Sequence, residues 1–155
     1  MPSCVLFDGS NIWITLQGKN SIILIDPGTM QIQDTFTVGT QPIRMICGND
    51  SIYVLNSDST INIVTTQGVQ DKITLSQDNY TDLTLDSTYI WVCASSGNVL
   101  AYPLDQNPQN ISGFPSGIIC NSILSIGNTI VVVDNNNNVL NIFSKNGNIK
   151  SSTKL

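Results

Sequence analysis

The chain has 155 residues, of which 41% are hydrophobic, and a formal net charge of −5 with only six basic residues. It is long enough for one domain with a substantial core, and no apolar run approaches the roughly 18 residues that a membrane-spanning helix needs. The scarcity of Lys and Arg argues against binding to nucleic acid or to anionic membranes. Glu and His are absent and Ala occurs twice, whereas Ile, Val, Thr and Asn are abundant, so the composition favours an all-β fold.

The first forty residues predict four short strands, at 4–8, 11–16, 21–26 and 31–38. The segments between them read DGSN, QGKN and DPGT. These turns are rich in residues that accept a positive φ or preset φ, as tight turns between antiparallel strands require.

The same pattern recurs along the whole chain. An apolar strand begins at Ile12, Ile52, Ile90 and Ile130, and the steps between these residues are 40, 38 and 40. Four-stranded units that repeat about every 39 residues are blades of a β-propeller. We therefore predict a single propeller domain over 1–155 with blades at about 2–41, 42–80, 81–118 and 119–155. The outer strand of the third blade is the least defined, because it falls near the irregular stretch DQNPQNISGFPSG (105–117).

The segments FDGSNIWIT (7–15) and NSIILIDPGTMQIQDTFTVGTQPIRM (20–45) resemble the repeats of the YVTN and virginiamycin B lyase-like propellers. Those repeats combine a Gly turn, an I-W/Y-V strand, an N-x-I/V-x-x-I-D strand, a T-I-x-V-G strand and a Pro that opens the next blade. The resemblance implies the fold. The lyase chemistry of that family depends on His, Glu and a divalent metal, and because this chain has neither residue no catalytic position is carried over.

Four blades would leave two apolar end faces, on the order of 600 Å² together, which we expect to be covered. We favour a two-fold dimer in which blade four of each chain meets blade one of the other and closes an eight-bladed ring. The alternative is a compact four-bladed propeller closed within one chain.

The inventory of side chains disfavours catalysis. Without His there is no Ser–His or Cys–His pair and no ordinary zinc site, and without Glu acid–base work would fall to Asp. We therefore predict no enzymatic activity, no cofactor and no metal. The stretch DNNNN (134–138) begins like a calcium loop, but Val139 and Lys145 stand where that loop needs Gly and Glu.

Candidate binding residues lie at the expected channel mouth and on the loops between second and third strands and between blades. Equivalent inner-strand positions hold Cys4, Arg44, Asp82 and Ser122, and an Arg44–Asp82 ion pair that lines the channel is favoured over a ligand contact. The candidate binding residues are Arg44, Asp82, Ser122, Lys19, Asn56, Asp58, Asn98, Asp134 and Asn136.

Three aromatic residues, Trp13, Tyr53 and Trp91, occupy equivalent second-strand positions. We favour a core role for them, with sugar binding as the alternative. The four cysteines show no C-x-x-C spacing, and we favour buried free thiols in a reducing compartment over disulfides.

These features favour a non-catalytic interaction or structural assembly module that binds a protein partner or its own copies, such as a virion component. The alternative is a glycan-binding, lectin-like propeller, and an Asp82-based lyase or hydrolase ranks third. No signal peptide is recognised, so we expect synthesis in the cytoplasm and incorporation into a larger particle.

Overall fold

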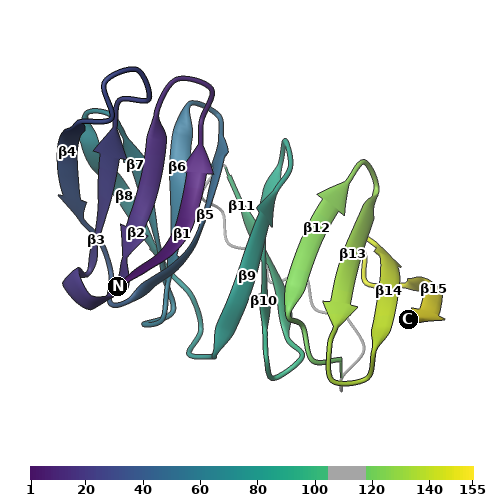
Figure 1. The fold of residues 1–155 in the computed structure, drawn as a ribbon. Helices are drawn as coiled ribbons and strands as arrows, with labels where there is room; N and C mark the ends of the chain where they lie inside the picture. The colour runs from purple at the N-terminus through teal and green to yellow at the C-terminus, as the bar shows by residue number, and fades with distance from the viewer. Residues whose placement is uncertain (105–117) are drawn as a thin grey trace. The chain divides into compact units, whose positions relative to one another are not determined.

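A computed structural model describes residues 1–104 and 118–155, which form antiparallel sheets joined by short turns (Figure 1). The chain divides into two compact units, 1–77 and 78–155, which are described separately below. Within the described ranges there is no α-helix, and no helix is long and apolar enough to cross a membrane.

The first unit contains two four-stranded sheets whose spatial order follows the sequence. A 3-10 turn, Gln17–Lys19, joins the second and third strands. The strands are β1 (Pro2–Phe7), β2 (Ile12–Leu16), β3 (Ser21–Ile25), β4 (Ile32–Thr37), β5 (Pro42–Gly48), β6 (Ser51–Asn56), β7 (Thr60–Thr65) and β8 (Gly68–Thr74).

The second unit repeats this arrangement with one described sheet of three strands and one of four. Its predicted remaining strand, the outer strand of the third blade, falls in residues 105–117, outside the described residues. The strands are β9 (Tyr80–Leu85), β10 (Tyr89–Ala94), β11 (Val99–Pro103), β12 (Ser122–Ile126), β13 (Thr129–Asp134), β14 (Val139–Ser144) and β15 (Ile149–Lys154).

Strand register confirms the equivalence of three of the four predicted inner-strand positions. Arg44 pairs with Leu55, Asp82 with Cys93 and Ser122 with Val133, each at the fourth residue of the repeating second-strand motif. The register shifts just before this pair in blades two and three, and between Pro2 and Val5 in blade one, which marks a β-bulge at the start of each of these inner strands.

The bulge lets a hydroxyl group tie neighbouring blades together. In the first unit Ser3 Oγ donates to the Pro42 carbonyl at 2.9 Å, and in the second Thr81 Oγ1 donates to the Cys120 carbonyl at 2.7 Å. Both hydrogen bonds link the first strand of one blade to the start of the next blade.

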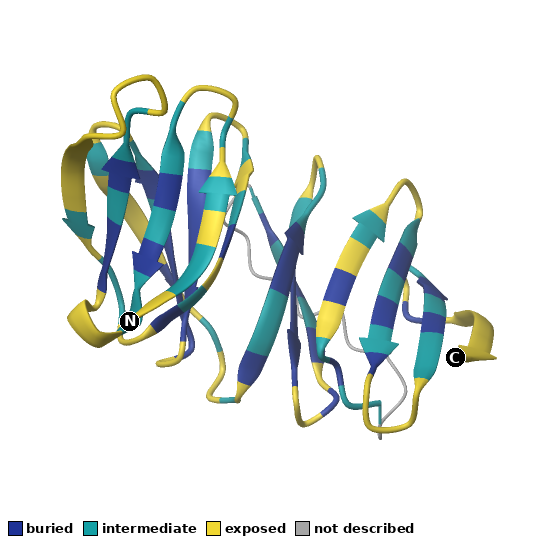
Figure 2. Cartoon of the chain, viewed as in Figure 1, coloured by how far each residue is buried: buried dark blue, intermediate teal, exposed yellow. Residues whose placement is uncertain are grey.

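Each unit has a core between its two sheets. In the first, Trp13, Ile22 and Leu24 of one sheet pack with Ile52 and Val54 of the other. Figure 2 shows buried positions along most strands, whereas the turns and the edge strands β4 and β15 are largely exposed. Strand β2 alternates buried and half-buried residues, as a strand with one face packed against a neighbouring sheet does.

The predicted core role of the aromatic residues agrees with this packing. Trp13, Tyr53 and Trp91 are 1%, 4% and 0% exposed. The ring of Trp13 lies 5.9 Å from that of Phe36, and Trp91 contacts Tyr89 edge to face at 5.6 Å.

The interpretation of the cysteines as buried free thiols is wrong for Cys93 and Cys120, which form a disulfide with a Cα–Cα distance of 5.8 Å. Both are fully buried, on β10 and just before β12. Because they are 27 positions apart in the sequence, only the packing of the third blade on the fourth brings them together. Cys4 and Cys47 are free, and Cys47 is exposed rather than buried. With this disulfide, the cysteines no longer indicate a reducing compartment.

Candidate functional site: a polar cavity between the first two blades

The predicted binding residues divide between the two units. Arg44 is exposed on β5 in the first unit, whereas Asp82 and Ser122 belong to the second. Ser122 Oγ donates to Asp82 Oδ2 at 2.7 Å and the Ile123 backbone N–H donates to the same oxygen at 3.1 Å. Asp82 thus ties the third blade to the fourth, and its ion pair with Arg44 stays a prediction.

Asn56 is fully buried and serves its own hairpin. Its Nδ2 donates to Asn62 Oδ1 at 2.9 Å and to the hydroxyl of Thr60 at 3.1 Å. Asp58, beside it, is exposed and accepts the Thr60 hydroxyl at 2.6 Å and the Thr40 backbone N–H at 2.9 Å. Burial raises the pKa of Asp58, but these hydrogen bonds more than offset it, so its pKa lies below the ordinary value.

The remaining predicted residues lie in or beside turns. Lys19 ends the 3-10 turn and is exposed. The amide of Asn98 donates to Asp78 Oδ2 at 2.7 Å. Asp134 is buried and accepts the backbone N–H groups of Asn136 and Asn137 at 3.1 Å each, so it closes its own turn.

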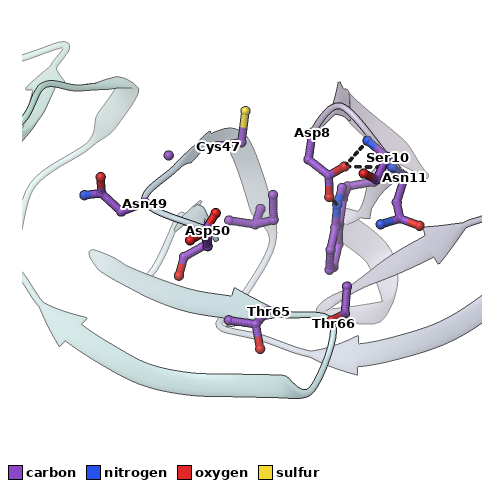
Figure 3. Close-up of a pocket in the computed structure, with 12 residues that line it drawn as sticks. Asp8, Ser10, Asn11, Cys47, Asn49, Asp50, Thr65 and Thr66 are labelled. Atoms are coloured by element: carbon purple, nitrogen blue, oxygen red, sulfur yellow. Dashed lines mark hydrogen bonds between the residues drawn. The ribbon is translucent and has the colours of Figure 1, made fainter.

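A cavity of about 400 Å³ lies elsewhere in the first unit, between its two blades. Three turns surround it: β1–β2 of the first blade, and β5–β6 and β7–β8 of the second (Figure 3). None of the nine predicted binding residues, all within the described ranges, is among its lining residues. The lining residues are Asp8, Ser10, Asn11, Trp13, Cys47, Gly48, Asn49, Asp50, Ser51, Ile52, Thr65 and Thr66.

Asp8 is held rigidly at the wall of this cavity. Its Oδ1 accepts the backbone N–H groups of Ser10 and Asn11 at 2.8 and 2.7 Å, and its Oδ2 accepts the indole N–H of Trp13 at 2.6 Å. Burial raises the pKa of Asp8, but the Trp13 and backbone hydrogen bonds outweigh it and hold the pKa below its usual range. The carboxylate is therefore ionised at neutral pH.

Asp50 reaches the same cavity from a two-residue hairpin turn. Gly48 pairs with Ser51, so Asn49 and Asp50 form the turn, with φ of +50° and +55°. Two consecutive positive φ values define the type I′ geometry that matches strand twist, and Asn and Asp tolerate it better than other non-Gly residues. Asp8 and Asp50 thus face the cavity from neighbouring blades (Figure 3).

The cavity is anionic and can accept hydrogen bonds from a ligand. Two carboxylates line it and no Lys or Arg does. The described part of the chain contains no group of three or more Cys, Asp, His or Glu side chains that could hold a metal ion. The Cys47 thiol has no neighbouring imidazole to activate it, because the chain contains no His. Electrostatic recognition is the chemistry that this arrangement offers.

Sequence reasoning missed Asp8 because its turn, DGSN, reads as an ordinary connection between strands. A signal was present in the sequence. The strand and turn of the first blade, FDGSNIWI, return as LDSTYIWV at 85–92, with the Asp and the Trp both kept.

No protein-family model and no curated protein matches the chain. Among solved structures, it is similar to a streptogramin B lyase, with a TM-score of 0.83 and 18% identity over 99% of this chain and 54% of that one. It is also similar to the computationally designed protein Ika8, with a TM-score of 0.80 and 11% identity over 98% of this chain and 48% of that one. The chain spans about half the length of each. These likenesses confirm the predicted β-propeller fold.

Proposed function

We propose that the protein is a non-catalytic β-propeller module that acts by associating with a second copy of itself through its end blades. The observation that carries this proposal is the exposure, on the first and last blades, of strand positions that are buried in the interior of each unit.

The first blade presents one such face. Val5 on β1 is 69% exposed, whereas the residues at the same register position in the second and fourth blades, Met45 and Ile123, are 5% and 4% exposed. Phe7, on the same side of β1, is 58% exposed. A largely apolar hollow of about 420 Å³, lined in part by Val5 and Phe7, marks this surface.

The last blade presents the opposite kind of face. Leu124 on β12 is 51% exposed, whereas Thr84, its register equivalent in the third blade, is 7% exposed because the fourth blade covers it. Ile126, further along the same side of β12, is 58% exposed.

These two faces are the two halves of one kind of interface. Within the first unit, the side of the first blade that carries Trp13 packs on the side of the second that carries Met45 and Val54. The last blade exposes the side that is equivalent to the Trp13 side of the first blade. The first blade exposes the side that is equivalent to the Met45 side of the second blade. A second copy therefore carries the surface that each end lacks. Two copies would also supply about as much chain as one copy of either similar structure.

The absence of His and Glu from the sequence supports a role without catalysis. Glycan binding through the aromatic set receives no support from the geometry, since Trp13, Tyr53 and Trp91 are all buried. Incorporation into a larger particle is a further step of the same proposal, and the size of the assembly in solution decides it.

The test is the mass in solution, measured by light scattering during size exclusion over a range of concentrations. A dimer has twice the chain mass of 16.8 kDa. A much larger particle extends the proposal to an assembly component. A monomer at every concentration would overturn it.

A matched pair of substitutions on the last blade identifies the surface used. Leu124→Asp charges the free side of the sheet, whereas Ile149→Asp charges an equally exposed position (53% against 51%) on the side that packs against the third blade. We expect the first variant to be monomeric and the second to associate as wild type. Association unchanged in both Leu124→Asp and Val5→Asp would refute this use of the end faces.

A further inference from the structure

The two units contain the same partly buried arrangement of an aspartate and a tryptophan, 78 residues apart. Trp13 Nε1 donates to Asp8 Oδ2 at 2.6 Å, and Trp91 Nε1 donates to Asp86 Oδ2 at 2.6 Å. The other carboxylate oxygen accepts the backbone N–H groups two and three residues further on, at 2.8 and 2.7 Å for Asp8 and at 2.8 and 2.9 Å for Asp86. The two carboxylates are therefore held in the same orientation by the same donors.

The units differ in which other groups contact the Oδ2 atom of the aspartate. In the second unit, Lys145 Nζ lies 2.8 Å from Asp86 Oδ2, and Ser125 Oγ donates to the same oxygen at 3.2 Å. In the first unit, Asp8 Oδ2 accepts the Trp13 indole N–H, and the Asn11 side chain also hydrogen-bonds to the carboxylate, but among the described residues no lysine reaches it. Since a carboxylate oxygen has room for more than one donor, Asp8 keeps hydrogen-bonding capacity that Asp86 has used.

Strand register identifies the residue that replaces Ser125 in the first unit. Ser125 pairs with Ile130, and Cys47 pairs with Ile52, the equivalent residue of the second blade. A thiol, which is a weak donor, thus stands where the second unit has a hydroxyl group.

Counting onward from paired residues gives the counterpart of the lysine. Lys145 follows Phe143, the partner of Ile130, by two residues, and Thr66 follows Val64, the partner of Ile52, by two residues. Thr66 is too short to reach across as Lys145 does. Thr66 and Cys47 both line the cavity beside Asp8.

We propose that the cavity between the first two blades binds a primary alkylammonium group, whose nitrogen pairs with Asp8 as the Lys145 ammonium pairs with Asp86. The cavity lies within the first unit and does not depend on association between copies.

The lining chemistry matches this ligand. The cavity carries the carboxylates of Asp8 and Asp50 and no basic side chain, so a cation is favoured over an anion or a neutral ligand. Its volume of about 400 Å³ accommodates a short alkyl chain, and Trp13 and Ile52 are apolar residues in its wall. A bare divalent ion is a poorer match, because hard cations such as calcium take six to eight oxygen ligands.

The experiment is a titration of the full chain with n-butylammonium chloride, read from the two tryptophan indole N–H signals in a ¹⁵N–¹H NMR spectrum. The Trp13 indole bonds the carboxylate that the ligand meets, so its signal should shift in a saturable way. The Trp91 signal should not shift, because Lys145 occupies the equivalent place. Sodium chloride at equal ionic strength and n-butanol, the neutral analogue, should leave both signals unchanged.

The duplication supplies matched variants. Thr66→Lys should close the first site and abolish the Trp13 response, whereas Lys145→Thr should make the Trp91 signal respond as well. Asp8→Asn should weaken binding roughly tenfold or more, the loss expected of a charge-assisted hydrogen bond. For wild type alone, no Trp13 shift, or equal shifts with butylammonium and butanol, would overturn the proposal.

The ammonium group has two sources, a free amine or the lysine side chain of a protein. Nα-acetyl-lysine N-methylamide carries the same group on a peptide backbone. Binding equal to or tighter than that of butylammonium would assign the site to a lysine side chain, and binding of butylammonium alone would assign it to a small amine.

Discussion

The Cys93–Cys120 disulfide should contribute measurably to stability. It joins residues 27 positions apart, and the loop-closure relation gives about 3.5 kcal/mol for a loop of this length. For a chain of this size, such a difference corresponds to a melting temperature lower by roughly 10 °C after reduction.

The cleanest comparison uses the Cys4→Ser/Cys47→Ser variant, in which the disulfide contains the only cysteines. The oxidised and reduced forms of this variant have the same sequence and differ by one bond. The difference between their free energies of unfolding therefore contains no contribution from a change of sequence. Urea unfolding followed by tryptophan fluorescence gives the free energy of unfolding of each form.

Thiol counting is the control. Wild type alkylated after unfolding without reductant should take up two labels, on Cys4 and Cys47, and four after reduction. Four labels without reductant, or equal unfolding midpoints for the oxidised and reduced variant, would refute the reasoning.

Three further predictions concern single contacts. The pKa of Asp86 is lowered to about 2 because the hydrogen bonds from Lys145, the backbone and Trp91 outweigh the effect of burial. Its contribution, about 2 kcal/mol, is therefore complete above the ordinary value of 3.8 and is lost as pH falls through about 2. Urea unfolding should show the stability advantage of wild type over Asp86→Asn narrowing by that amount in acid, and a constant difference would contradict it. Thr81→Val should lose about 1 kcal/mol of unfolding free energy with the bond to the Cys120 carbonyl, and an unchanged denaturation midpoint would argue against this link. Gly39→Ala should destabilise by roughly 1–3 kcal/mol, because its Cβ would lie 2.5 Å from Thr60 Oγ1, and a melting temperature equal to that of wild type would count against this close approach.

The fold was predictable because one pattern occurs four times. The second-strand motif at Ile12, Ile52, Ile90 and Ile130 fixes blade length, and each repeat strengthens the assignment of the others. Since strands pair with their neighbours in the chain, the order of strands within each sheet followed from the hairpin turns alone. The predicted outer strand of the third blade depended on a stretch without periodicity, and that stretch lies outside the described residues.

The cavity was not predictable, because it depends on contacts between blades. A repeat shows which positions are equivalent, but not that Lys145 crosses from one blade to Asp86 of another, nor that Thr66 is too short to do the same. Asn56 illustrates the opposite error. Its place in a polar turn suggested a binding residue, whereas it is buried and bonded within its hairpin.

The nearest-neighbour pairing of strands has a consequence for how the chain reaches its structure. Every described strand pairs only with the strand before or after it, so each hairpin forms from residues a few positions apart. Such local closures cost little loop entropy and proceed in microseconds. All strands of the first unit lie before residue 78, so this unit can acquire its core while the second is still being synthesised. Folding on the ribosome can therefore proceed two blades at a time, with the core of the first unit formed before the second unit is complete.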